Sequence, residues 1–308
     1  MQRLPLLAEI AVSALALAAC GPHSNSICDG AAINCDRHYN QVTFAAAHDS
    51  FAYAAGGNIQ YSFPNQDRPI AEQLEYGIRT FGIRPCPSWG ADTGTLYVTH
   101  NYDTFHGDLG GEPLLNILAT IKSFLEANPT EIVSLLEEDS GVTSAQVAAV
   151  FTQAGLIPYL YIHDASKGWP TLREMAARGS RLVLFTSNSP AQPWQLPMWS
   201  FIVDTDYNVT EASQFSCEFY RGVGTNDLYF INQFIYRDDG HGVVLADPQK
   251  ALIANDPAAA YARALGCWQA KQRIPNFLYV DYFLEGDIKQ AVDRLNALPR
   301  SCGGACVD

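Results

Sequence analysis

Side chains that can transfer protons or hold a charged group stand repeatedly just after short apolar runs of the sequence. His48 and Asp49 follow one such run, Arg84 follows the next and His100 ends a third. Carboxylates occupy later runs or their ends, namely Glu137, Glu138, Asp204 and Asp281. Two imidazoles and one guanidinium in the same pocket would suit the acid–base cleavage of a phosphodiester.

In such a cleavage, one imidazole removes the proton of the attacking hydroxyl and the other protonates the leaving oxygen. The guanidinium stabilises the charge that builds up on the phosphoryl oxygens, and carboxylates orient the imidazoles and make them more basic. His106 is an alternative second imidazole, but we favour His100 because it ends a predicted strand. The candidate catalytic residues are therefore His48, His100, Arg84, Asp49 and Asp281.

Eight apolar or aromatic runs bounded by turn residues predict the β-strands that position these side chains. Several runs are apolar almost without interruption, as in parallel strands that helices cover. The runs comprise residues 41–48, 79–84, 95–100, 131–137, 181–187, 201–207, 228–235 and 276–283.

Helical patterns lie between many of these strands. Residues 69–77 start at a proline and end at Gly77, and residues 113–127 carry a leucine and isoleucine stripe on one face. Further helices are predicted at residues 144–154, 170–178, 248–272 with breaks, and 287–298, the last capped by Asp287.

The alternation of strands and helices predicts an α/β fold, an irregular (β/α)8 TIM barrel. It is irregular because the links 85–94 and 188–200 are too short for a covering helix. In such barrels the carboxyl ends of the strands form one mouth, so the polar side chains at those ends would converge there.

The motifs at these strand ends resemble the catalytic X region of phosphatidylinositol-specific phospholipase C. The resemblance rests on residues 47–50 (AHDS), 77–84 (GIRTFGIR) and 96–100 (LYVTH), and residues 276–282 (NFLYVDY) are similar to that family's last strand. Residues 28–37 look like the cysteine-bearing start of secreted phospholipase-C-like phosphodiesterases. The likeness covers most of the chain and implies the TIM barrel of that family.

The resemblance implies a role for each candidate catalytic residue. His48 would be the general base, supported by Asp281, and His100 would be the general acid, supported by Asp49. Arg84 would hold the phosphate at the position where eukaryotic members of the family place a calcium ligand. The expected reaction therefore needs no metal or other cofactor.

Three positions depart from the family's pattern. Gly82 stands where the family often has Asp, and Asn101 and Tyr102 replace a glycine pair. No arginine lies near Ser187, where bacterial members bind inositol. The expected substrate is therefore a phospholipid of the phosphatidylinositol type or another small phosphodiester. The candidate substrate-binding residues are Asp204, Tyr207 and Tyr282.

Two alternatives stay open at this point. Glu137 and Glu138, together with Asp49, could bind Ca²⁺, whose ligands are hard oxygens, in a calcium-dependent phosphodiesterase of the same fold. Gly82 and Ser187 favour a lipoprotein that binds phosphorylated ligands at the same mouth without turnover. The sequence has no GxSxG, HExxH, Walker or GxGxxG motif that would indicate another catalytic class.

The N-terminal residues predict export. Residues 1–19 combine Arg3 with an apolar stretch, as a signal peptide does, and residues 17–20 (LAAC) resemble the bacterial lipobox. Lipid attached to Cys20 would anchor the protein in the bacterial cell envelope, and the protein would be secreted if the lipobox is not used. A short tether, residues 20–27, would then lead into a single domain, residues 28–308.

Export implies an oxidising compartment in which disulfides persist. Spacing alone does not fix the connectivity of the remaining cysteines. The favoured pairs are Cys28–Cys35, Cys217–Cys267 and Cys302–Cys306, which leaves Cys86 as a buried thiol.

Composition limits the partners further. The chain has 308 residues and is 48% hydrophobic, enough for a large core. Its formal net charge of −13 makes nucleic acid a poor partner and gives no long-range attraction to an anionic membrane. The expected partners are a small phosphodiester substrate and a membrane reached through Cys20.

Overall fold

In a computed structural model, the structure describes residues 26–53, 64–87, 94–98, 112–138, 141–238, 240 and 244–300. Its main feature is an eight-stranded sheet in which hydrogen-bonded neighbours follow the order β7-β6-β5-β2-β1-β12-β9-β8. All of its ladders are parallel. The strands are β1 (Phe44–Ala47), β2 (Thr80–Ile83), β5 (Val133–Glu137), β6 (Leu182–Thr186), β7 (Gln195–Pro197), β8 (Ile202–Asp204), β9 (Leu228–Asn232) and β12 (Pro275–Val280).

This strand order is the chain order taken around a barrel, with β7 and β8 at the two edges of the sheet. The single helical turn α6 (Met198–Phe201) joins these two edge strands. The predicted irregular TIM barrel is therefore confirmed, and its irregularity is concentrated at the seam between β7 and β8.

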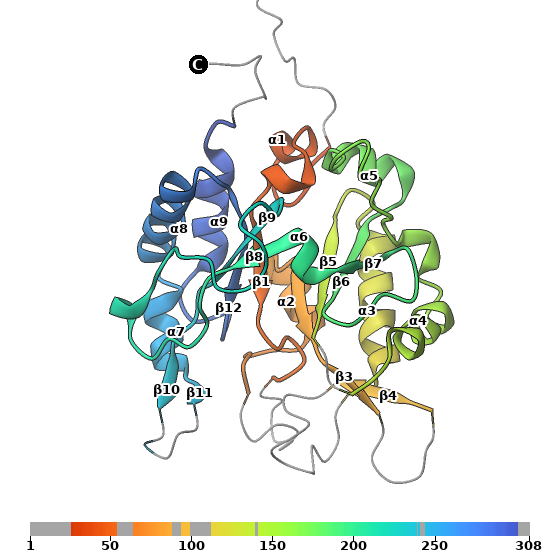
Figure 1. Ribbon diagram of the computed structural model, residues 1–308, viewed down its shortest axis with the longest axis horizontal. Helices are drawn as coiled ribbons and strands as arrows, with labels where there is room; N and C mark the ends of the chain where they lie inside the picture. The colour runs from red at the N-terminus through yellow and green to blue at the C-terminus, as the bar shows by residue number, and fades with distance from the viewer. Residues whose placement is uncertain are drawn as a thin grey trace, which may run out of the picture.

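Helices cover the outside of the sheet, with α3 and α4 on one side of the molecule and α8 and α9 on the other (Figure 1). The predicted helices are confirmed within a few residues, as are their ends: Gly77 ends α2 in the left-handed conformation, and the Asp287 side chain caps α9. The helices are α1 (Ala32–Cys35), α2 (Ile70–Tyr76), α3 (Leu114–Ala127), α4 (Ser144–Gln153), α5 (Leu172–Arg178), α7 (Pro248–Ala254), α8 (Pro257–Lys271) and α9 (Ile288–Ala297).

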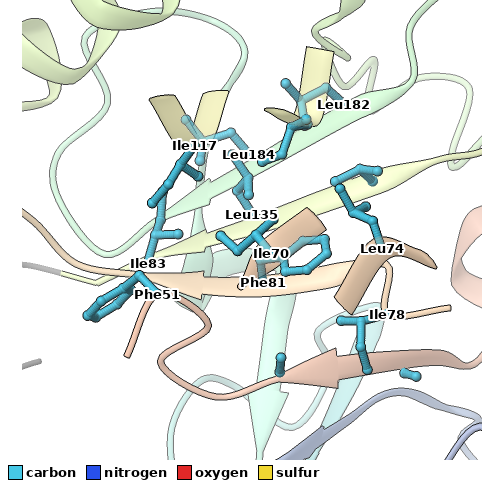
Figure 2. Close-up of a cluster of buried hydrophobic side chains, with 14 of the residues drawn as sticks. Phe51, Ile70, Leu74, Ile78, Phe81, Ile83, Ile117, Leu135, Leu182 and Leu184 are labelled. Atoms are coloured by element: carbon cyan, nitrogen blue, oxygen red, sulfur yellow. The ribbon is translucent and has the colours of Figure 1, made fainter. Parts of the chain in front are cut away.

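Side chains of successive strand residues alternate between two cores. The outer core lies between sheet and helices, and Figure 2 shows Leu74 and Ile117 of α2 and α3 over Leu135 of β5. The inner core fills the barrel and includes Phe277 and Tyr279 of β12. Each large side chain buried in this way contributes roughly 1.5–3 kcal/mol. The alternation decides which side chains at the strand ends point into the mouth.

One predicted barrel strand was wrong. Residues 96–98 form β4 (Leu96–Val98), which pairs antiparallel with β3 (Pro85–Pro87) in a separate two-stranded sheet. In the barrel β2 pairs directly with β5, and the unpredicted β7 supplies the eighth strand beside β6, so the link 188–200 holds a strand as well as a helical turn. The prolines of β3 leave it without the N–H groups that an interior strand would donate, which suits a short hairpin outside the barrel.

Two hairpins lie at the same end of the molecule, opposite α1 (Figure 1). They are β3–β4 and the pair β10 (Tyr236–Asp238) and β11 (Val244–Ala246). Each of them follows, directly or closely, the carboxyl end of a barrel strand. They therefore flank the mouth, and α1 lies at the closed base.

The disulfides Cys28–Cys35 and Cys217–Cys267 are present as predicted. Cys86 is buried and takes part in neither of them. The expected pair Cys302–Cys306 and the predicted anchor Cys20 lie outside the described residues. Within the part of the chain that the structure describes, no helix has both the length and the apolar character of a membrane span.

Candidate active site

The register of the sheet brings three of the predicted residues to one place. Ala47 pairs with Val280 across β1 and β12, so the next residues on these strands, His48 and Asp281, stand opposite each other. Arg84 directly follows β2, the other neighbour of β1. All three alternate with outer-core residues and therefore face the barrel interior at its carboxyl end.

Asp281 holds the imidazole of His48. Its Oδ1 lies 2.9 Å from His48 Nδ1, and both side chains are nearly inaccessible to solvent. The Asn65 amide donates to the same Oδ1 at 2.9 Å. A carboxylate on Nδ1 fixes the tautomer that leaves Nε2 as the basic nitrogen.

Aromatic rings enclose the His48 imidazole. The Phe234 ring stacks on it with centroids 4.4 Å apart and an interplanar angle of 6°, and the Tyr279 ring lies at 5.0 Å on a tilt. Burial lowers the pKa of His48, but the carboxylates of Asp49 and Asp281 outweigh it, so its net pKa is raised. The site therefore holds a strengthened base that is kept out of bulk water.

Arg84 lies between two carboxylates beside this imidazole. Its Nε is 3.1 Å from Asp49 Oδ1, and its Nη2 is 2.9 Å from Glu138 Oε2. Burial alone would lower the pKa of Arg84, but these two carboxylates raise it, so the guanidinium stays charged. Asp49 Oδ2 also lies 3.5 Å from His48 Nε2, so Asp49 links the base to the guanidinium.

Asp49 reaches both partners from a left-handed backbone conformation, with φ of 40°. Few residues other than glycine adopt this region, and Asp is among the more tolerant. The Ser50 hydroxyl stabilises the turn by donating to the Ala47 carbonyl at 2.8 Å. Backbone strain of this kind concentrates at functional sites.

Two of the predicted substrate-binding residues, Asp204 and Tyr207, lie at or just after the carboxyl end of β8. Asp204 is fully buried and receives two hydrogen bonds from the Arg221 guanidinium, which lies over the ring of Tyr207 at 4.6 Å. The Trp199 ring lies 4.4 Å from the same guanidinium. Asp204 therefore holds the cation Arg221 at the seam of the barrel. The sequence analysis did not single out Arg221.

Tyr282 has a different position. Its hydroxyl donates to the Pro64 carbonyl at 2.6 Å, and its amide donates to the Asn65 carbonyl at 2.7 Å. It thus fixes the segment that carries Asn65 and supports the pair of Asp281 and His48. Asn65 follows a proline outside any predicted strand, so no sequence pattern pointed to it.

The two glutamates of the calcium alternative do not act together. Glu138 pairs with Arg84, whereas Glu137 is fully buried and accepts a hydrogen bond from Asn188 at 3.4 Å. Among the described residues, no group of three His, Cys, Asp or Glu side chains could hold a metal ion. The proposed second imidazole, His100, and its rival His106 lie outside the described residues.

Known proteins are similar to this chain in sequence and in fold. The PI-PLC X family (PI-PLC X 1) matches residues 34–296. PI-PLC X domain-containing protein 1 of Arthroderma benhamiae is 29% identical over 309 residues, 95% of either chain. A protein of the same fungus named as an uncharacterized secreted protein is 27% identical, over 90% of this chain and 64% of its own length.

A crystal structure of phosphatidylinositol-specific phospholipase C from Staphylococcus aureus superposes with a TM-score of 0.58 at 16% identity, covering 85% of this chain and 94% of that one. The chain therefore belongs to the PI-PLC X family.

Proposed function

We propose that the protein cleaves phosphodiesters of the phosphatidylinositol type or a related class by acid–base catalysis. The observation that carries the proposal is the buried His48–Asp281 pair beside the Arg84 guanidinium. An isolated buried ion pair is weak evidence of function, but here a basic imidazole and a charged guanidinium share one carboxylate, Asp49.

In the proposed reaction His48 Nε2 accepts the proton of the attacking hydroxyl while that oxygen bonds to phosphorus. The bond from phosphorus to the leaving oxygen breaks, and the leaving oxygen takes a proton from the general acid, for which we propose His100. Asp281 keeps the His48 imidazole in the reactive tautomer. Arg84 binds the non-bridging oxygens, where negative charge accumulates, so the reaction proceeds without a metal ion.

The structure supports a head-group site at the seam between β7 and β8. There Tyr207 and Trp199 flank Arg221, and Asp204 neutralises part of its charge. We propose that a polar head group lies against this aromatic and charged wall, with Tyr282 keeping the neighbouring loop in place.

The test is turnover of phosphatidylinositol and of glycerophosphodiesters by the wild type and by His48→Ala. We expect His48→Ala to lower kcat by about 10²–10⁴-fold, the range for loss of a general base. The matched control is His163→Ala, a histidine packed against Trp169 and Phe201 away from the mouth, which should keep full activity. Equal turnover in wild type and His48→Ala would contradict the assignment of the base.

The two alternatives predict other results in the same assay. A calcium-dependent enzyme would lose activity in chelator and regain it with Ca²⁺, whereas we expect chelator to have no effect. A non-catalytic binding protein would turn over none of these substrates yet would still bind their head groups.

We further propose that the protein is exported and anchored through a lipid on Cys20. The two disulfides fit an oxidising compartment, and one relative is named as a secreted protein. Cys20→Ser should move the protein from the membrane fraction to the soluble fraction and abolish fatty-acid labelling, with Cys86→Ser as the control. Unchanged membrane association of Cys20→Ser would contradict the anchor.

A further inference from the structure

Tyr279 lies in the floor of the active site. It faces the barrel interior on β12, two residues before Asp281, and pairs across the sheet with Ala46 of β1. A Cβ atom at Gly82 of β2 would overlap the phenolic oxygen of Tyr279 and would lie 2.8 Å from its Cζ. The small residues Ala46 and Gly82 therefore leave the space that the phenol fills, and its hydroxyl reaches across β1 to β2.

The Tyr279 hydroxyl differs from the hydroxyls of the other buried tyrosines. It has no hydrogen-bond acceptor among the residues that the structure describes, although the side chain is only 2% exposed. By contrast, Tyr39, Tyr161, Tyr229 and Tyr282 are hydrogen-bonded to Ser134, His163, Cys217 and Pro64 respectively. Buried hydroxyls are normally paired, so the unpaired proton of Tyr279 calls for an explanation.

The surroundings of this hydroxyl keep it a donor. Burial, together with the carboxylates of Glu138 and Asp49, raises the pKa of Tyr279 well above its usual value, against the opposing charge of Arg84. The phenol is therefore neutral and protonated at any working pH. The charges of Arg84 and of its two carboxylate partners all act on this phenol, which therefore lies beside the guanidinium that would receive a phosphate.

The charge balance of the site explains the use of a neutral donor. Three carboxylates, those of Asp49, Glu138 and Asp281, surround the two cationic groups of the described site, Arg84 and His48. With three carboxylates against at most two cations, this group offers an incoming phosphodiester anion no net positive charge. A phenol donates a hydrogen bond to the anion without adding another charge that must be neutralised.

We propose that Tyr279 is a catalytic residue that donates its phenolic hydrogen bond to a non-bridging oxygen of the bound phosphodiester, in concert with Arg84. Gly82 is the positioning residue that gives the hydroxyl access to that oxygen. This inference rests on the proposed function and adds a specific donor to it.

The test is Tyr279→Phe, which removes one oxygen and keeps the ring. With phosphatidylinositol in mixed micelles, we expect kcat to fall by about 10–100-fold with KM changed less than about 2-fold, somewhat below the loss seen for a typical oxyanion donor. Because the phenolic proton has no acceptor among the described residues, we expect the melting temperature to stay the same or rise. The matched control is Tyr229→Phe, which removes a hydroxyl bonded to the Cys217 carbonyl and should lower the melting temperature while keeping kcat.

A second measurement reports the contact itself. Sulfur accepts hydrogen bonds poorly, so the two phosphorothioate diastereomers of phosphatidylinositol replace either non-bridging oxygen in turn. For the wild type we expect one diastereomer to be slowed more than the other. In Tyr279→Phe the extra penalty on that diastereomer should disappear, and in Tyr229→Phe it should remain.

The outcomes separate the inference from the proposed function. Activity that His48→Ala abolishes but Tyr279→Phe keeps would overturn the inference and leave the function standing. A lower melting temperature with unchanged kcat and unchanged thio effects would make Tyr279 a packing residue only. Absence of turnover by the wild type would overturn the proposed function and the inference together.

Discussion

Two buried clusters of charge lie at opposite ends of the barrel, and both contain an arginine next to an acid. The mouth cluster is made of His48, Asp49, Arg84, Glu138 and Asp281, at the carboxyl ends of β1, β2, β5 and β12. The base cluster is made of Asp29, Arg79 and Glu131, next to α1 and before the strands β2 and β5 begin. Their composition is similar, but their geometry is different.

In the base cluster the protein itself uses the guanidinium. Arg79 Nε donates to Glu131 at 2.7 Å, its Nη1 donates to the carbonyls of Leu74 and Ile78, and its Cζ lies 4.7 Å from the centre of the Phe124 ring. Glu131 in turn accepts from the Asp29 amide at 3.1 Å. The cluster therefore joins the N-terminal segment to the sheet, and the protein itself uses Nε and Nη1 of Arg79.

In the mouth cluster, carboxylates contact the guanidinium of Arg84 at Nε and Nη2. The side chain of Arg84 is 26% exposed, against 11% for Arg79, and the carboxylates of Asp49 and Glu138 hold it. The neighbouring groups of Arg84 are an imidazole with a raised pKa and a phenol that has no acceptor among the described residues. A buried charge alone thus does not indicate a functional site. The arrangement of reactive groups around the charge indicates one.

The sharpest test of this comparison exchanges each arginine for lysine. Arg84→Lys should lower kcat by about 10³-fold at nearly constant stability, because an ammonium cannot bridge two carboxylates and a phosphate in one plane. Arg79→Lys should keep kcat and lose roughly 1–3 kcal/mol of stability, because its buried acceptors lose their donors. Phosphodiester turnover and urea denaturation measure the two effects, and a similar loss of turnover in both variants would break the comparison.

Asp281→Asn tests the pair that makes His48 a base. We expect kcat to fall by about 10²-fold because the imidazole loses the carboxylate that fixes its tautomer. The carboxylate also raises the pKa of His48, so its loss should move the acidic limb of the pH profile of kcat/KM to lower pH. A lower rate with an unmoved acidic limb would mean that Asp281 only positions the ring.

Local patterns predicted the parts of this molecule that local forces decide. β1 is a continuous apolar run and β12 is apolar except at Asn276. His48 and Asp281 follow these strands directly, so strand ends and site could be predicted together. Residues 96–98 have the alternation of a strand, but whether a strand joins the barrel or a hairpin depends on its partner. β7 escaped prediction because Gln195 and Pro197 leave a three-residue strand without an apolar run.

The site residues that the sequence analysis did not identify are those whose role depends on contacts with distant parts of the chain. Asn65 reaches Asp281 across 216 residues of sequence, and nothing near it marks that contact. Tyr279 could have been predicted to face the mouth, since it lies two residues before Asp281 on the same strand. The space at Gly82 that admits its hydroxyl becomes visible only when both strands are placed beside β1.

The smallest expected effect concerns the base cluster, where Asp29→Asn should stabilise the protein at high pH. Burial raises the pKa of Asp29 to about 7, although Arg79 and Lys289 oppose it. An unfolded aspartate has a pKa of about 3.9, so the folded state binds the extra proton between these two values. The stabilising contribution of the protonated carboxyl is therefore complete below pH of about 4 and is lost as the pH rises to about 7.

Asparagine is neutral at every pH and tolerates the φ of 44° at this position. Against wild type, Asp29→Asn should gain about 1–2 kcal/mol at pH 8 and nothing near pH 4, as measured by urea unfolding at both values. Turnover should not change, since the cluster lies at the end of the barrel away from the mouth. If Asp29→Asn were instead less stable than wild type at pH 8 and less so at pH 4, Asp29 would be ionised in the folded protein. The base cluster would then be stabilised by ion pairs, as the mouth cluster is.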